Sequence, residues 1–86
     1  MTDVANAPVI LYSQPGCGPC VGVEAYLDRA GIPFELRNIR EDEAAAARVS
    51  ELGYNGTPVI EHPGGHFKGY NPEKLESIKV ALFDMV

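Results

Sequence analysis

Residues 9–20 read VILYSQPGCGPC, and they carry the strongest indication of the fold in this chain. Its first four residues form a continuous apolar run between Pro8 and a set of turn-forming residues, which is typical of a strand buried on both faces. Two cysteines follow, at a place where a helix is predicted to begin. The stretch therefore predicts a central strand that delivers a pair of thiols to the start of a helix.

This first helix is predicted over residues 18–30. Pro19 suits its first turn, where no backbone N–H is needed, and Gly31 suits the position just after its end. The apolar residues recur at the spacing of a single helix face, which predicts a stripe directed at the core. The stripe consists of Val23, Tyr26, Leu27 and Ala30.

Residues 34–39 alternate between apolar and polar side chains, which predicts a half-exposed strand at the edge of a sheet. Glu41, Asp42 and Glu43 open a second helix, because acidic side chains are favourable at the positive end of a helix dipole. Gly53 is expected to close this helix. Its buried side should consist of Ala45, Val49 and Leu52.

The last third of the chain predicts a hairpin followed by a helix. Residues 58–61 form a short strand, and the turn residues 63–65 return the chain along a second strand at 66–68. Asn71 can cap the last helix, with Pro72 in its first turn. The buried stripe of this helix should consist of Leu75, Ile78 and Leu82.

Together these elements follow the order β-α-β-α-β-β-α, which indicates an α/β fold. The first two strands are joined by a helix, so they should be parallel with a right-handed crossover. The last two strands are joined by a turn, so they should be antiparallel. We therefore predict a four-stranded mixed sheet flanked by three helices, in a single domain that spans residues 1–86.

The composition excludes several classes of function. The formal net charge is −5, and the 7 basic residues are scattered among 12 acidic ones, which argues against nucleic-acid or anionic-membrane binding. No apolar run is long enough to span a bilayer, and residues 1–8 lack the features of a secretory signal. We expect a monomeric cytoplasmic protein that binds neither nucleic acid nor membrane.

The motif that carries chemistry is Cys17-Gly18-Pro19-Cys20. A cysteine just before a helix faces unpaired backbone N–H groups, which stabilise its thiolate and lower its pKa. Gly18 and Pro19 add little bulk, so a partner disulfide can approach. We predict that Cys17 attacks the substrate and that Cys20, one turn on and turned towards the core, resolves the mixed disulfide. This chemistry requires no metal and no other cofactor.

Two rival interpretations of the cysteines are weaker. His62 and His66 have a zinc-finger spacing, but they follow Cys20 at far more than the usual 12–15 or so residues and flank a turn. These histidines are expected to be solvated residues of the hairpin. Alternatively, the chain could be a partner-binding module whose cysteines are incidental. An intact cysteine pair at a strand–helix junction favours redox chemistry over both.

A second element of the site is Thr57-Pro58. X–Pro bonds can be cis, and a cis bond here would turn the Thr57 backbone towards the cysteines, where it could pair with an extended substrate segment. The alternative is a trans proline that begins a strand. Tyr12, at the end of the first strand, is a candidate to seal the site, with core packing as the alternative.

Three segments resemble the thioredoxin superfamily and, within it, the glutaredoxin-like NrdH-redoxins. They are the Y-S-x-P-x-C-x-x-C pattern of residues 12–20, the T-P-V of residues 57–59 and the H-F-K-G-Y-N-P-E-K-L of residues 66–75. The resemblance implies a thioredoxin/glutaredoxin-like fold and a cis bond before Pro58. The substrate contacts that follow from it are Thr57, Pro58, Val59, Gly69 and Tyr70. For Phe67 and Tyr70, core packing is the default interpretation and substrate contact the alternative. The position of Tyr70 after Gly69, in a loop expected to approach the cysteines, favours contact for that residue.

The resemblance also implies a function. NrdH-redoxins take electrons from thioredoxin reductase and deliver them to a class Ib ribonucleotide reductase. This chain is therefore expected to be a dithiol electron donor for that enzyme or for another disulfide-containing protein. A glutathione-dependent glutaredoxin and a general thioredoxin-like protein disulfide reductase stay open as alternatives.

The chain departs from the glutaredoxin pattern at three places. It has C-G-P-C where glutaredoxins usually have C-P-Y-C, and residues 68–71 replace the Gly-Gly-Asp segment that holds glutathione. Glutathione is therefore expected to be a poor reductant. Gln14 stands where glutaredoxin-like chains often have Lys, so the helix end is expected to supply most of the pKa depression at Cys17.

Overall fold

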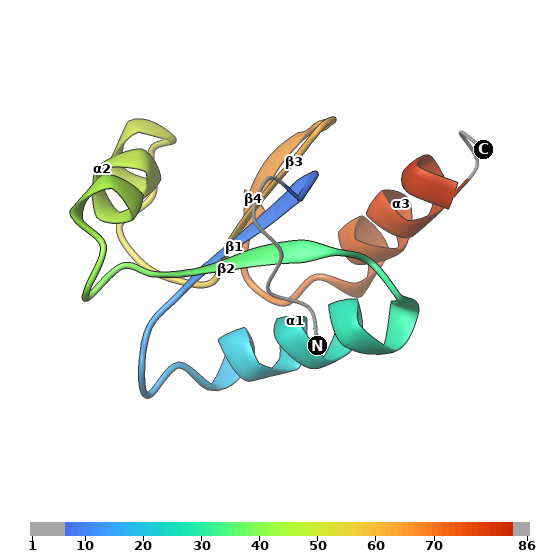
Figure 1. The fold of residues 1–86 in the computed structure, drawn as a ribbon, viewed down its shortest axis with the longest axis horizontal. Coiled ribbons are helices and arrows are strands. Elements are labelled where there is room, and N and C mark those ends of the chain that lie inside the picture. Colours follow the sequence, from blue (N-terminus) through green and yellow to red (C-terminus); the bar gives the residue numbers. More distant parts are fainter. Residues whose placement is uncertain (1–6, 84–86) are drawn as a thin grey trace.

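The computed structural model describes residues 7–83, which form four strands and three helices in the predicted order (Figure 1). The elements are β1 Val9–Ser13, α1 Gly18–Ala30, β2 Phe34–Asn38, α2 Glu43–Glu51, β3 Val59–His62, β4 Gly65–Lys68 and α3 Pro72–Phe83. Within this range, no helix combines the length and the apolar character needed to cross a membrane. The segment examined above for a secretory signal lies mostly outside the described residues.

The strands form one mixed sheet in the order β2-β1-β3-β4. β1 runs parallel to β2, where Leu11 lies opposite Leu36, and antiparallel to β3, where Leu11 lies opposite Ile60. β3 and β4 form an antiparallel hairpin in which His62 pairs with Gly65. The predicted mixed sheet and the edge position of β2 are confirmed. The antiparallel pairing of β1 with β3 is a feature that the sequence did not predict.

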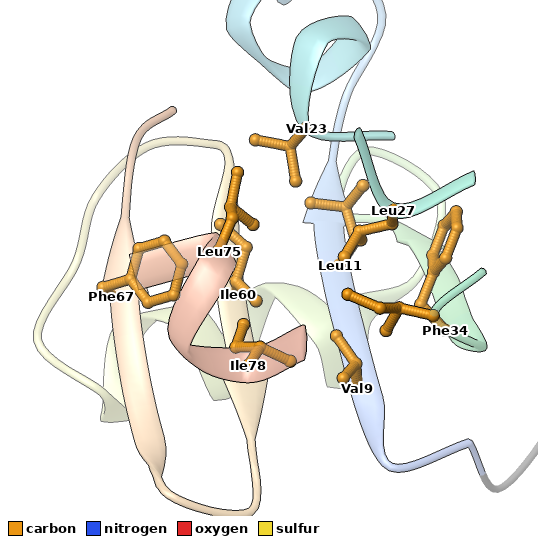
Figure 2. Close-up of a cluster of buried hydrophobic side chains, with 10 residues drawn as sticks. Val9, Leu11, Val23, Leu27, Phe34, Ile60, Phe67, Leu75 and Ile78 are labelled. Carbon is orange, nitrogen blue, oxygen red and sulfur yellow. The ribbon is translucent and has the colours of Figure 1, made fainter. Parts of the chain in front are cut away.

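The larger core lies between the sheet and the pair α1 and α3 (Figures 1 and 2). The expected stripes of these two helices are largely confirmed, because Val23, Leu27, Leu75 and Ile78 are buried, while the remaining stripe residues are partly buried against them. Full burial of each such side chain contributes roughly 1.5–3 kcal/mol. The cluster comprises Val9, Leu11, Val23, Leu27, Ile32, Phe34, Ile60, Phe67, Leu75 and Ile78.

A smaller core lies on the opposite face of the sheet, under α2 (Figure 1). Its buried members are Tyr12 and Val59 from the sheet and Ala45 and Val49 from α2, while Leu52 is partly buried. Because β1 contributes residues to both cores, the prediction of a strand buried on both faces is confirmed for most of its length.

Side-chain caps set the helix boundaries. The Asp42 carboxylate accepts a hydrogen bond from the backbone N–H of Ala45 at 3.1 Å, so α2 begins at Glu43 and not at Glu41. In the same way, Asn71 accepts from the backbone N–H of Lys74 at 3.1 Å, which confirms the predicted cap of α3. Gly31 follows α1 in the left-handed conformation with φ 72°, as predicted.

His62 is half-buried, which the sequence did not predict, whereas His66 is exposed as predicted. The ring of His62 lies edge-on to Phe67 with 5.8 Å between centroids, and partial burial lowers the pKa of His62. Nδ1 of His66 lies 2.9 Å from the hydroxyl of Tyr54 in a hydrogen bond. The partner of His62 comes from the pairing of β3 with β4, whereas Tyr54, the partner of His66, comes from the loop after α2.

Candidate functional site

The two cysteines form a disulfide at the N-terminus of α1, with 5.3 Å between their Cα atoms. Cys17 is the N-cap residue, and its Sγ accepts a hydrogen bond from the backbone N–H of Cys20 at 3.3 Å. This N–H is one of the helix donors that have no partner within the helix. After reduction, the same donor and the helix dipole stabilise a thiolate on Cys17.

The two sulfurs differ in their access to solvent. Cys17 is half-buried, whereas Cys20 is only 4% exposed. Gly18 and Pro19 between them are exposed, and a Cβ added at Gly18 would meet no heavy atom within 4 Å. A partner disulfide can therefore approach Cys17 but not Cys20, which is the arrangement that an attacking and a resolving cysteine require.

The loop before β3 lies beside the cysteines. The Thr57–Pro58 peptide bond is cis. Thr57 lines a surface hollow together with Cys17, and its Oγ1 accepts a hydrogen bond from Nε2 of Gln14 at 2.9 Å. Pro58 is buried, and its carbonyl accepts from the backbone N–H of Gly69 at 2.9 Å. Gly69 thus anchors the loop after β4 to the loop that carries Thr57.

Tyr70 lies beside the first turns of α1. Its Cδ1 would lie 3.5 Å from a Cβ built on Gly22, and the side chain is 46% exposed. Val21, the neighbour of Gly22 in α1, is 67% exposed. Tyr70 and Val21 therefore leave apolar surface on the helix that begins at the disulfide. Phe67, in contrast, is buried in the larger core, as its packing interpretation predicted.

Two predicted site residues lie elsewhere. Val59 is fully buried, and β3 lies between β1 and β4, so the structure leaves its side chain no surface for substrate. Tyr12 packs in the smaller core and donates to Oε1 of Glu61 at 2.8 Å, which agrees with core packing and not with sealing the cysteines. Burial, followed by the hydrogen bond to Glu61, raises the pKa of Tyr12 to about 12. Both side chains belong to the smaller core, because alternate residues of a central strand face opposite sides of the sheet.

The structure adds Arg40 to the site. It lines the hollow that contains Cys17 and Thr57, and its Nε donates to Oε1 of Gln14 at 3.3 Å. Gln14, which also lines the hollow, therefore links Arg40 to Thr57 through two hydrogen bonds. Arg40 was not among the predicted site residues, because it comes from the loop after β2. The only sequence signal was a basic residue directly after the edge strand.

A metal site finds no support in the described residues. Within residues 7–83, no three or more His, Cys, Asp or Glu side chains gather closely enough to hold an ion. Both cysteines are engaged in the disulfide, His62 contacts Phe67, and His66 is hydrogen-bonded to Tyr54.

The cysteine pair lies at the N-terminus of α1, beside the loop that contains the cis proline, on a four-stranded mixed sheet. These features together define a small dithiol redoxin. The glutaredoxin family model matches residues 9–67, and the chain belongs to the glutaredoxin family. It is accordingly a thiol–disulfide oxidoreductase with a thioredoxin/glutaredoxin-like fold.

Individual relatives agree with this assignment. The glutaredoxin-like protein NrdH of Lactococcus lactis is 31% identical over 70 residues, which cover 81% of this chain and 97% of that protein. The N-acetyl-S-hydroxy-L-cysteine reductase of Bacillus subtilis is 30% identical over 84 residues, which cover 95% of this chain and 88% of that protein. The crystal structure of the thioredoxin-like protein BC3987 matches with a TM-score of 0.76 at 30% identity, covering 81% of this chain and 97% of that one. The resemblance to NrdH-like redoxins is thereby confirmed.

Proposed function

We propose that this chain is a dithiol electron donor of the NrdH type, which accepts electrons from thioredoxin reductase and passes them to ribonucleotide reductase or another disulfide-containing protein. The observation that carries the proposal is the accessible Cys17 at the helix N-terminus with Cys20 buried behind it. The likeness to the NrdH protein of Lactococcus lactis over most of both chains supports it.

The reaction follows from the geometry. The Cys17 thiolate attacks one sulfur of the substrate disulfide, forms a mixed disulfide and releases the other sulfur as a thiolate, which takes up a proton. The Cys20 thiolate then attacks the Sγ of Cys17 and releases the second substrate sulfur. Two electrons have moved to the substrate, and Cys17 and Cys20 are oxidised. The disulfide is then the only redox group that the cycle needs.

Several features support thioredoxin reductase over glutathione as the electron source. In the segment that replaces the Gly-Gly-Asp of glutaredoxins, the N–H of Gly69 is bonded to Pro58 and the side chain of Asn71 caps α3. Both polar groups are therefore already engaged. The C-G-P-C motif is also that of thioredoxins and not the C-P-Y-C of most glutaredoxins.

The test is to supply the oxidised protein with NADPH and thioredoxin reductase or with glutathione, glutathione reductase and NADPH. We expect rapid NADPH consumption only with thioredoxin reductase, and a potential of roughly −270 mV, below the −200 to −230 mV of glutaredoxins. Fast turnover with glutathione and a potential near −200 mV would instead support the glutaredoxin alternative.

A second candidate function is the reduction of a small oxidised cysteine derivative. It is favoured by the likeness to the N-acetyl-S-hydroxy-L-cysteine reductase of Bacillus subtilis, which extends over 95% of this chain. In such a reaction Cys17 attacks the sulfur that bears the hydroxyl, water leaves, and Cys20 releases the reduced thiol. The rates with this substrate and with a protein disulfide, measured side by side, decide between the two candidates.

The remaining assignments follow from the same proposal. The chain acts as a single-domain monomer in the cytoplasm and binds neither nucleic acid nor membrane. The support is its acidic net charge of −5, which disfavours phosphate surfaces. Size-exclusion chromatography of the reduced and oxidised protein tests the monomer, and a dimer in either state would contradict it.

A further inference from the structure

Arg40 lines the same hollow as Cys17 and is held there by two hydrogen bonds. Its backbone N–H donates to Oδ1 of Asn38 at 2.9 Å, and its Nε donates to Oε1 of Gln14 at 3.3 Å. The amide of Gln14 is in turn fixed by its bond to Thr57. These contacts tie the loop after β2 to the loop before β3, so the guanidinium lies at the hollow that contains Cys17.

Arg40 differs from the arginines that form ion pairs. Arg37 pairs with Glu35, and Arg48 pairs with Glu51 and Glu61. Within residues 7–83, Arg40 has no carboxylate partner, although the chain contains 12 acidic residues and 7 basic ones. Only its Nε is engaged by a side chain, so its terminal N–H groups can donate to a ligand.

Charge is distributed unequally around Cys17. Lys68 extends over Gly56, where its Nζ would lie 3.4 Å from an added Cβ, and Gly56 lines the same hollow as Arg40. A second hollow contacts Cys17 as well, and its lining includes the acidic residue Glu24 and the apolar residue Val21. A negative group on a bound substrate is therefore favoured on the Arg40 side and disfavoured on the Glu24 side.

We propose that Arg40 is a specificity-determining residue that binds a carboxylate which the substrate carries close to its reacting sulfur. The inference rests on the proposed disulfide-reductase function and names the substrate class for it. A planar guanidinium with free terminal N–H groups can accept a carboxylate in two parallel hydrogen bonds. The carboxylate can come from an acidic side chain next to the cysteine of a protein segment, or from a small cysteine derivative.

The experiment compares matched substrates that differ only in charge. One pair consists of peptide disulfides with Glu or Gln beside the cysteine, and the other of diacetylcystine and its diamide. The wild-type protein is compared with Arg40→Gln and with Arg29→Gln, which removes the same charge from an exposed position near the end of α1. Circular dichroism of each variant verifies that it is folded.

We expect the wild type to prefer the acidic member of at least one pair by about threefold to tenfold in kcat/KM, as for a partly exposed charge-assisted contact. Arg40→Gln should reduce this ratio to about one, and Arg29→Gln should keep it. If the wild type prefers the acidic peptide disulfide, the carboxylate belongs to a protein substrate. If it prefers diacetylcystine over the diamide, the carboxylate belongs to a small-molecule substrate.

Two results would overturn the inference while leaving the proposed function intact. The wild type could reduce acidic and neutral members at equal rates, or its preference could survive in Arg40→Gln. If the wild type reduced none of the four substrates with either reductase, the proposed function itself would be wrong.

Discussion

The two faces of the sheet are held to their helices by different interactions. The face under α1 and α3 is closed by apolar side chains, and no buried polar group interrupts its cluster. The face under α2 combines a smaller apolar cluster with a polar network, in which Glu61 accepts from the hydroxyl of Tyr12 and from the guanidinium of Arg48. The disulfide belongs to α1, so the apolar face supports the chemistry. Substitutions on the two faces should therefore differ in their effects on activity and on the free energy of unfolding.

The largest difference is expected at the cysteines that begin α1. Cys17→Ser should abolish reduction of substrate disulfides, because it removes the attacking thiolate. Cys20→Ser should still attack and should accumulate as a mixed disulfide on Cys17. Mass spectrometry after addition of a disulfide substrate measures both. An adduct on Cys17→Ser but not on Cys20→Ser would reverse the assigned roles.

The apolar face should also dominate stability. Leu27→Ala removes a fully buried side chain of α1 and is expected to lower the free energy of unfolding by about 2–5 kcal/mol. Val80→Ala, at a 46% exposed position of α3, serves as the control and should change it by less than about 0.5 kcal/mol. Urea denaturation of the oxidised proteins measures both. Equal, small losses would show that α1 is not closely packed on the sheet.

A smaller effect is expected on the α2 face. Tyr12→Phe removes the hydrogen bond to Glu61 but keeps the ring in the smaller core, so it should cost about 0.5–1.5 kcal/mol of stability. Reduction of a small aromatic disulfide should proceed at the wild-type rate, because Tyr12 packs away from the cysteines. A clear loss of that rate would restore Tyr12 as a residue that seals the site.

The smallest effect is expected in the pH dependence of the free energy of unfolding. Arg48 holds the pKa of Glu61 below its usual range, mainly through its hydrogen bonds. Because the folded-state pKa is lowered, the stabilisation is present above the unfolded value of about 4.3 and is lost as the pH falls through the folded value. Glu61→Gln should therefore be less stable than wild type at pH 7 by up to about 1 kcal/mol, since the pair is partly exposed. Below pH 4 the difference should shrink, and a constant difference from pH 7 to pH 3 would exclude this linkage.

The order of the elements, the cap of α3 and the cysteine motif could be predicted from the sequence alone. The stripe of α1, the Asn71 cap of α3 and the position of Cys17 before a helix all depend on residues a few positions apart, so local periodicity and capping chemistry reveal them. The family resemblance rested on the same short segments, and it correctly implied the fold and the cis bond before Pro58.

The contacts between distant segments became visible only in the folded chain. The pairing of β1 with β3 buries Val59 and directs Tyr12 to the core under α2, although both had been assigned to the site. Gln14 is hydrogen-bonded to Thr57 and Arg40, which are 43 and 26 positions away, and Arg40 thereby lines the same hollow as Cys17. Local patterns report which face of an element is apolar. They do not report which elements become neighbours, because that depends on the burial that the whole chain achieves when it folds.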